Sequence, residues 1–291
     1  MTKIIFKNEF KRILYHKIMT SVTSMTSSVT ANYLFFCKTS EGYIMKILAE
    51  LLQNNIKNGC FVVSKKGITL RMTDSNRKIL IDFELIADNF AQFKCKANDN
   101  MSIGLNFSHF YKMVKSIKKK DSVVFFIEEG KETELGIKVI PKEKNRITTS
   151  YVKIQNLQSL DIELPQGYQH SIIVPSNEYM KMIKDLNNMG GNMISVSSTS
   201  SQVRFGCNSN GVYSRDIIFG DEDHDDKEIR LQEFETEQLT RITKVAGLST
   251  QIQIYQSEGL PILFKSNVGN LGKIYVYVKD KTLQEDGVDE Q

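Results

Sequence analysis

The feature that most constrains the fold is an internal repeat, in which stretches of the chain reappear in the same order further on. Residues 44–47 (Ile-Met-Lys-Ile) match 179–182 (Tyr-Met-Lys-Met) at an offset of 135, and the same offset sets 68–70 on 203–205. A second stretch, 110–130, matches 239–259 at an offset of 129. Because two such matches in order are hard to obtain by chance, the sequence predicts two diverged copies of one domain.

Each copy is expected to contain strand, helix, several strands, helix and several strands, which makes an α+β fold. Apolar residues recur three and four positions apart at Ile44, Ile47, Leu48 and Leu51, which is typical of a helix. They alternate at Ile79, Ile81, Phe83 and Leu85, which is typical of a strand. Pro175-Ser176 predicts the start of the third helix, with the serine as N-cap.

The segment between the copies loses this periodicity and contains Pro165 and Gly167, so we expect an interdomain connector there. The predicted organisation is a basic N-terminal extension (1–32) expected to be disordered, a first domain (33–154), a connector (155–170), a second domain (171–281) and an acidic tail (282–291).

The net charge of +4 belongs to the N-terminal extension, which holds five basic residues and one acidic residue. The remainder has 33 of each, so any affinity of the body for an anionic partner depends on where its charges lie. A basic extension rich in Ser and Thr is compatible with an organellar transit peptide. It is also compatible with a disordered tail, or with sequence upstream of a start at Met19 or Met25.

Three of the four expected helices carry a basic pair three residues apart, and the first offers one lysine. This spacing places both charges of a pair on one helix face. The predicted DNA-facing residues are Lys46, Lys112, Lys115, Lys181, Lys184, Arg241 and Lys244. Lysines that meet phosphates give attraction that depends on salt and not on base sequence.

No catalytic set is apparent, because the phosphate-binding, nucleophile-elbow and zinc-protease motifs are all missing from the sequence. The four cysteines are far apart and form no C-x-x-C pair, so we expect neither disulfides nor a zinc site. The acidic run 221–226 is more typical of a solvated loop than of a metal site, since neighbouring carboxylates cannot all converge on one ion. We therefore expect no metal, no cofactor and no enzymatic activity.

Over residues 34–280 the sequence resembles the proliferating cell nuclear antigen family. The resemblance rests on Lys46 through Asp74-Ser75, on Leu105-Asn106-Phe107-Ser108, on Pro175-Ser176-x-Glu178-Tyr179-x-Lys181, and on Leu260-Pro261 with 272–277. It implies a DNA-clamp fold, with two-domain subunits forming a homotrimer around duplex DNA, helices lining the hole and sheets outside. It also implies tethering of DNA polymerase, clamp loader and other PIP-box proteins.

The resemblance further implies a partner groove under the connector. Its predicted residues are Leu80, Ile162, Leu164, Pro165, Pro261 and Tyr277, to which the apolar connector residue Leu157 is added. Unpaired edge strands are expected at 147–154, with Tyr151 in the trimer interface, and at 212–219. Lys279-Asp280 replaces the family's usual Ala-Pro, and Lys279 is expected to favour acidic flanks in a partner peptide.

Three other functions stay open at this point. A checkpoint-type clamp subunit would share the fold and assemble with different subunits, whereas a viral processivity factor could work without closing a ring. A metal-dependent DNA-processing enzyme would use the acidic run. The expected location is the nucleus or, for a viral protein, a viral replication compartment, with organellar targeting by residues 1–32 as the alternative.

Overall fold

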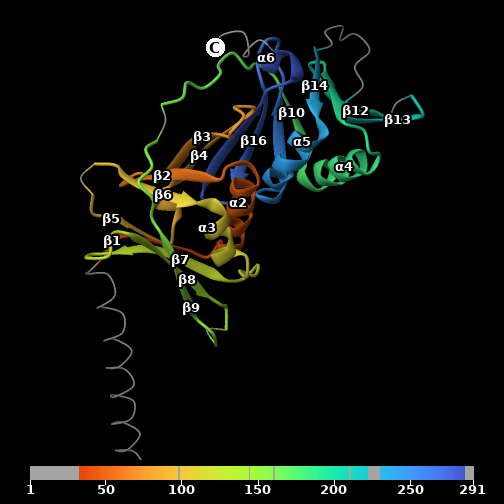
Figure 1. Cartoon of the computed structure of the whole chain (residues 1–291). Helices are drawn as coiled ribbons and strands as arrows, with labels where there is room; N and C mark the ends of the chain where they lie inside the picture. Colours follow the sequence, from red (N-terminus) through yellow and green to blue (C-terminus); the bar gives the residue numbers. More distant parts are fainter. Residues whose placement is uncertain are drawn as a thin grey trace, which may run out of the picture.

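The computed structural model describes residues 33–285 except 98, 144, 160, 210 and 222–229. Its strands form three antiparallel sheets, and its main helices lie together beside them (Figure 1). The α+β fold expected from the repeat is therefore confirmed.

The first half of the chain supplies a five-stranded sheet in the order β5-β1-β7-β8-β9. Its strands are β1 (Tyr33–Thr39), β5 (Gln92–Cys95), β7 (Ser122–Glu128), β8 (Glu134–Ile140) and β9 (Thr148–Lys153). The second half supplies a four-stranded sheet in the order β13-β12-β11-β14. Its strands are β11 (Met193–Ser198), β12 (Gln202–Ser209), β13 (Tyr213–Gly220) and β14 (Arg230–Glu235).

An eight-stranded sheet joins the two halves, in the order β10-β15-β16-β17-β4-β3-β2-β6. Its strands from the first half are β2 (Asn58–Ser64), β3 (Gly67–Thr73), β4 (Ile79–Ile86) and β6 (Met101–Asn106). Those from the second half are β10 (Ser171–Pro175), β15 (Gln251–Tyr255), β16 (Ile262–Val268) and β17 (Gly272–Val278). The halves meet where β17 pairs antiparallel with β4.

The helices are α2 (Gly42–Asn55), α3 (Phe107–Val114), α4 (Ser176–Asn188), α5 (Thr236–Ile242) and the short C-terminal α6 (Lys281–Glu285), with 3-10 turns η1 (Ala87–Asn89) and η2 (Thr243–Gly247). Helix α2 contacts α3, α5 and η2, and α4 contacts α5 and η2, so helices from both halves form one layer. None of the described helices is long and apolar enough to cross a membrane.

Local sequence determines the N-cap of α3, whereas a tertiary contact determines where α4 begins. Asn106 caps α3, because its Oδ1 accepts a hydrogen bond from the backbone N–H of His109 at 3.0 Å. The prediction that Ser176 caps α4 was wrong. The Ser176 N–H donates to the Thr250 carbonyl at the end of the β10–β15 ladder, so Pro175 is the N-cap and Ser176 is already helical. The buried Ser176 Oγ has no hydrogen-bond partner among the described residues.

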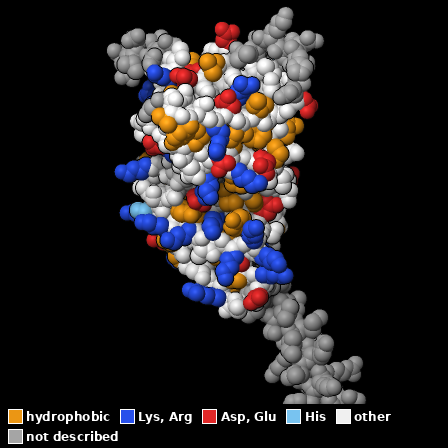
Figure 2. All heavy atoms as spheres, turned by 90° about the vertical axis from the view of Figure 1, so that its right-hand side faces the viewer, with side chains coloured by type: hydrophobic (Ala, Val, Ile, Leu, Met, Phe, Trp, Pro, Cys, Tyr) orange, Lys and Arg blue, Asp and Glu red, His pale blue; other side chains and the backbone are white. Residues whose placement is uncertain are grey.

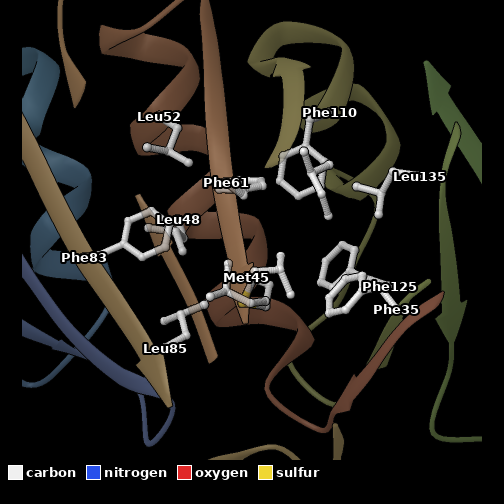
Figure 3. Close-up of a pocket in the computed structure, with 13 residues that line it drawn as sticks. Phe35, Met45, Leu48, Leu52, Phe61, Phe83, Leu85, Phe110, Phe125 and Leu135 are labelled. Carbon is white, nitrogen blue, oxygen red and sulfur yellow. The ribbon is translucent and has the colours of Figure 1, made fainter. Parts of the chain in front are cut away.

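The core is continuous across both halves, from Phe35 in β1 to Val278 in β17. Figure 3 shows a cavity in the first half that is lined only by apolar side chains, among them Phe35, Phe61 and Phe125. Such a lining offers no polar group to orient a ligand, so this cavity is a packing feature of the core.

Candidate DNA-facing surface and partner groove

The helix layer carries most of the predicted DNA-facing residues. Figure 2 looks onto the side of the molecule that includes α4, and Lys and Arg side chains gather over the middle and lower part of this face. Lys112, at the end of α3, and Lys115, its C-cap, are exposed and have no ion-pair partner among the described residues. They are therefore available to an anionic ligand.

Lys181 and Lys184 are exposed on α4. The Lys181 Nζ lies 2.9 Å from Glu178 Oε1, and its side chain is still 67% exposed. An ion pair in such an exposed place contributes little, so Lys181 can exchange Glu178 for another anion at small cost. Together with α3, α4 offers a second pair of accessible cations.

Two further predicted lysines are engaged within the protein. Lys46 Nζ donates to the Ile117 carbonyl at 3.3 Å and lies 5.4 Å from the ring centroid of Tyr43. Lys244 Nζ lies 2.9 Å from Glu50 Oε1. Both lie on the helix layer, but each has a competing partner.

Arg241 occupies the position equivalent to Lys112 at the offset of 129, and its environment differs. Its Nη2 lies 3.2 Å from Asp74 Oδ2, and its guanidinium also donates to the carbonyls of Asn54 and Asn55. The side chains of Arg241 and Asp74 are 25% and 1% exposed. Arg241 thus binds the second half of the chain to the first, and we leave it out of the proposed DNA contacts.

This interdomain contact yields a stability prediction. Asp74 Oδ1 also accepts the backbone N–H groups of Lys78 and Ile79, so the buried carboxylate is fully used. Asp74→Asn keeps the shape and leaves the guanidinium of Arg241 without its counter-charge. We expect a loss of about 2 kcal/mol in the free energy of unfolding, measured by urea denaturation.

The matched control is Asp185→Asn on the exposed face of α4, for which we expect a change within about 0.5 kcal/mol. Combining Asp74→Asn with Arg241→Gln should cost clearly less than the sum of the two single changes. Additive losses would show that the two side chains do not act as a pair.

The predicted partner groove lies on the outer face of the eight-stranded sheet. Leu80, Leu263 and Tyr277 are buried there as a small cluster, and Ile162, Leu164 and Tyr168 of the connector pack against it. The register places Tyr255, Leu263, Tyr277 and Leu80 in one row across β15, β16, β17 and β4. A continuous apolar row therefore runs across the junction of the two halves.

The connector is fixed to this face at two points. Arg71 pairs with Asp82 at 2.9 Å and donates to the Ile162 carbonyl at 3.1 Å. The Tyr168 hydroxyl donates to the Pro261 carbonyl at 2.6 Å. Figure 1 shows the connector as a long green segment along the outer side of the molecule. Half-buried Pro165 lies between these two points in the sequence.

One predicted groove residue lies elsewhere. Leu157 is beside Gly104 at the free edge of β6, where Gln155 forms a bridge with Gly104. Strands β2 and β3 separate that edge from Leu80 in β4. The placement of Leu157 in the groove was wrong, because the connector first crosses two strands before it reaches the cluster. Leu160, also in the connector, falls outside the described residues.

Sequence reasoning missed Leu263, which belongs to this buried cluster, and Tyr168, Tyr255 and Tyr275, which pack against it. The alternation along β15, β16 and β17 could have indicated three of them, since Tyr255, Leu263 and Tyr275 fall on the same outward face as Tyr277. Burial, with nearby Asp82 as a smaller cause, raises the pKa of Tyr277 to about 12. Its hydroxyl is protonated at neutral pH, as that of an ordinary tyrosine also is, and can donate a hydrogen bond.

The Lys279-Asp280 pair has a structural role at the end of this face. Asp280 is buried and its Oδ1 accepts the N–H of Leu283, which starts α6. Gln284 Nε2 donates to the Lys279 carbonyl at 2.9 Å. The chain thus uses the pair to begin its last helix, which contacts β14.

The acidic run can be placed only in part, since residues 222–226 lie outside the described residues. Among the described residues, no three His, Cys, Asp or Glu side chains group as a metal site would require.

Comparison with known proteins identifies the family. The model of the proliferating cell nuclear antigen N-terminal domain matches residues 34–164, and that of the C-terminal domain matches residues 163–281. The chain belongs to the proliferating cell nuclear antigen family. As a member of this family it is a sliding clamp, a processivity factor of DNA replication.

A curated relative and a solved structure agree with this family. The chain is 23% identical over 253 residues to "Probable DNA polymerase sliding clamp 1" of Paramecium bursaria Chlorella virus 1, covering 84% of this chain and 95% of that protein. The crystal structure of proliferating cellular nuclear antigen from Entamoeba histolytica superposes with a TM-score of 0.74 at 18% identity, covering 86% and 99% of the two chains. This likeness shows that the DNA-clamp fold is shared.

Proposed function

We propose that the protein is a homotrimeric ring that encircles duplex DNA and carries DNA polymerase, clamp loader and other PIP-box proteins on its outer face. The proposal of a ring rests on two strands that have no pairing partner on one side within the described part of the chain. Strand β17 of the second half pairs with β4 of the first half within the chain. Their counterparts in the repeat, β9 and β13, are both unpaired sheet edges.

Both edges expose apolar side chains. On the first edge Ile147 and Tyr151 are exposed, and on the second Val212, Tyr213 and Ile218. A long exposed apolar edge strand presents unpaired backbone N–H and C=O groups that can pair with a strand of another chain. Pairing β9 of one subunit with β13 of the next repeats the internal junction between subunits, and such a head-to-tail contact forms a ring when the rotation from one subunit to the next closes.

The internal junction also supplies the register. The repeat sets β7 on β15 at an offset of 129 and β3 on β12 at an offset of 135. Followed across the paired strands, these offsets become 126 for β9 on β17 and 134 for β4 on β13. Tyr277 faces Leu80 in the chain, so Tyr151 should face Ser214 of the neighbouring subunit. The same register sets Ile147 against Ile218, which joins two exposed apolar side chains.

For the hole we propose that the accessible lysines contact the DNA backbone, foremost Lys112, Lys115, Lys181 and Lys184 and, with weaker access, Lys46 and Lys244. Lysines on flexible stems offer attraction to phosphates without reading base edges. Such contacts let the ring move by one base pair at little cost, which is what a slider needs.

On the outer face we propose that a PIP-box peptide, in which a glutamine and an aliphatic residue precede two aromatics, binds over Leu80, Tyr277 and Pro261 beside the connector. Replacing both Ile162 and Leu164 by Ser removes apolar contact area from one side of the groove. We expect the affinity for a labelled PIP peptide to fall at least about tenfold in an anisotropy titration.

The control for this groove is Leu157→Ser, because Leu157 lies at the β6 edge and should leave peptide binding unchanged. Equal binding by the wild type and the double variant would place the partner site elsewhere. A loss caused by Leu157→Ser alone would contradict the geometry of the connector.

The family supports a non-catalytic scaffold that acts at a site of DNA replication, for which we propose the nucleus or a viral replication compartment. Light scattering of the purified protein separates the remaining alternatives. A mass of about 100 kDa, three times the 33.3 kDa chain, supports the ring, whereas a monomer at micromolar concentration favours a checkpoint-type subunit or a non-ring factor.

A further inference from the structure

Beside the apolar row of the groove lies a second row that contains an unusual lysine. The strand register aligns Gln253, Lys265, Tyr275 and Asp82 across β15, β16, β17 and β4. Lys265 is two residues from Leu263 on the same strand and face, a separation of about 7 Å along the strand. Its ammonium group therefore lies at the border of the groove.

Lys265 is held between two aromatic rings. Its Nζ lies 5.9 Å from the ring centroid of Tyr255 and 5.7 Å from that of Tyr275. Contacts of this kind attract the ammonium group to the ring faces and so favour this position of a flexible lysine. Tyr255 also belongs to the apolar row, so the same ring contacts both the groove and the cation.

No carboxylate pairs with Lys265 among the described residues. The nearest acidic residue in its row is Asp82, on the far side of Tyr275, and Asp82 is already paired with Arg71 at 2.9 Å. A half-buried cation without a counter-charge among the described residues attracts an anion that arrives with a ligand.

We propose that Lys265 determines partner specificity, by selecting peptides that carry an acidic side chain next to the apolar residues that fill the groove. The inference rests on the proposed partner groove and adds to it a charge preference. It moves the expected source of that preference from Lys279, at the end of β17, to Lys265, in the sheet itself.

The test uses pairs of PIP peptides that differ only by Glu or its neutral isostere Gln, placed in turn at each position flanking the aromatic pair. Anisotropy titrations at low salt compare the wild type with Lys265→Gln. We expect at least one flanking position at which Glu binds about fivefold more tightly than Gln. In Lys265→Gln this ratio should fall to about one, while the Gln peptide keeps its affinity.

Two control variants locate the effect. Both Lys279→Gln and Lys273→Gln should keep the fivefold preference. Lys273 lies on the same face of the sheet in the next row, opposite Glu84 in the strand register. Loss of the preference in Lys279→Gln but not in Lys265→Gln would overturn the proposal, as would equal binding of Glu and Gln peptides to the wild type.

The outcomes also separate this inference from the groove itself. If Glu and Gln peptides bind the wild type equally and Ile162→Ser with Leu164→Ser abolishes binding, the groove stands and the role of Lys265 is refuted. If no peptide binds the wild type, both the proposed partner groove and the proposed role of Lys265 are refuted.

Discussion

Replacing Tyr151 by Ala should convert the proposed ring into monomers at micromolar concentration. Tyr151 is 47% exposed on the edge strand β9, and its ring packs edge-on against Phe126 with centroids 6.0 Å apart. Gly136 in β8 lies between them in the strand register. Because glycine has no side chain, the Phe126 ring can lie over β8 and reach Tyr151. This support holds the tyrosine in place at the proposed interface, where a large aromatic contact would contribute about 2 kcal/mol or more.

In the proposed ring the loss recurs at every interface, so the variant should dissociate over a range of protein concentration in which the wild type is intact. The measurement is light scattering or sedimentation across protein concentrations. The matched control is Tyr33→Ala, which also contacts Phe126 but lies away from the edge. It should leave the oligomer unchanged, and monomerisation by both variants would point to general loss of sheet packing.

The register can be tested independently of stability. With Tyr151 opposite Ser214, Thr149 faces Asp216 of the neighbouring subunit, so a chain carrying Thr149→Cys and Asp216→Cys should form covalent trimers on mild oxidation. Thr149→Cys with Ile218→Cys is shifted by two residues and should cross-link poorly. Efficient cross-linking only in the shifted pair would contradict the register inferred from β17 and β4.

Reversing the charge of the accessible helix lysines should abolish most of the attraction to DNA. The variant changes four exposed residues to Glu: Lys112, Lys115, Lys181 and Lys184. Each lost phosphate contact lowers the slope of log affinity against log salt by about 0.9, so we expect affinity for duplex DNA to fall more than about tenfold at low salt. Thermal unfolding should change little, because these side chains lie in solvent.

The matched control makes the same change in charge on the outward face of the sheets. Its four substitutions to Glu are at Lys38, Lys94, Lys138 and Lys273. If net charge alone governed binding, both variants would lose affinity alike. The decisive measurement is stimulation of a polymerase on primed circular DNA, and equal stimulation by the helix variant and the wild type would show that the helices do not face DNA.

Several features of the fold followed from local patterns. The repeat predicted two copies of one domain, and the apolar spacing from Ile44 to Leu51 predicted α2, because a period of 3.6 has few alternatives over that length. The alternation from Ile79 to Leu85 predicted β4. The edge strands at 147–154 and 212–219 were also expected, and β9 and β13 lie there at the ends of their sheets.

The sequence alone determined the helices that carry basic residues, since these depend on periodicity within a few turns. It also determined the duplicated α+β architecture, since segments of the chain match at fixed offsets. The two edge strands were expected from the two-domain organisation and the family resemblance. Only the tertiary structure decided how equivalent residues differ in role. Lys112 is exposed whereas Arg241 pairs with Asp74 from the other half of the chain, a contact 167 residues apart in sequence. The groove likewise unites Leu80, Leu263 and Tyr168, and Leu157 is excluded from it, because sheet order and not sequence distance sets which side chains meet.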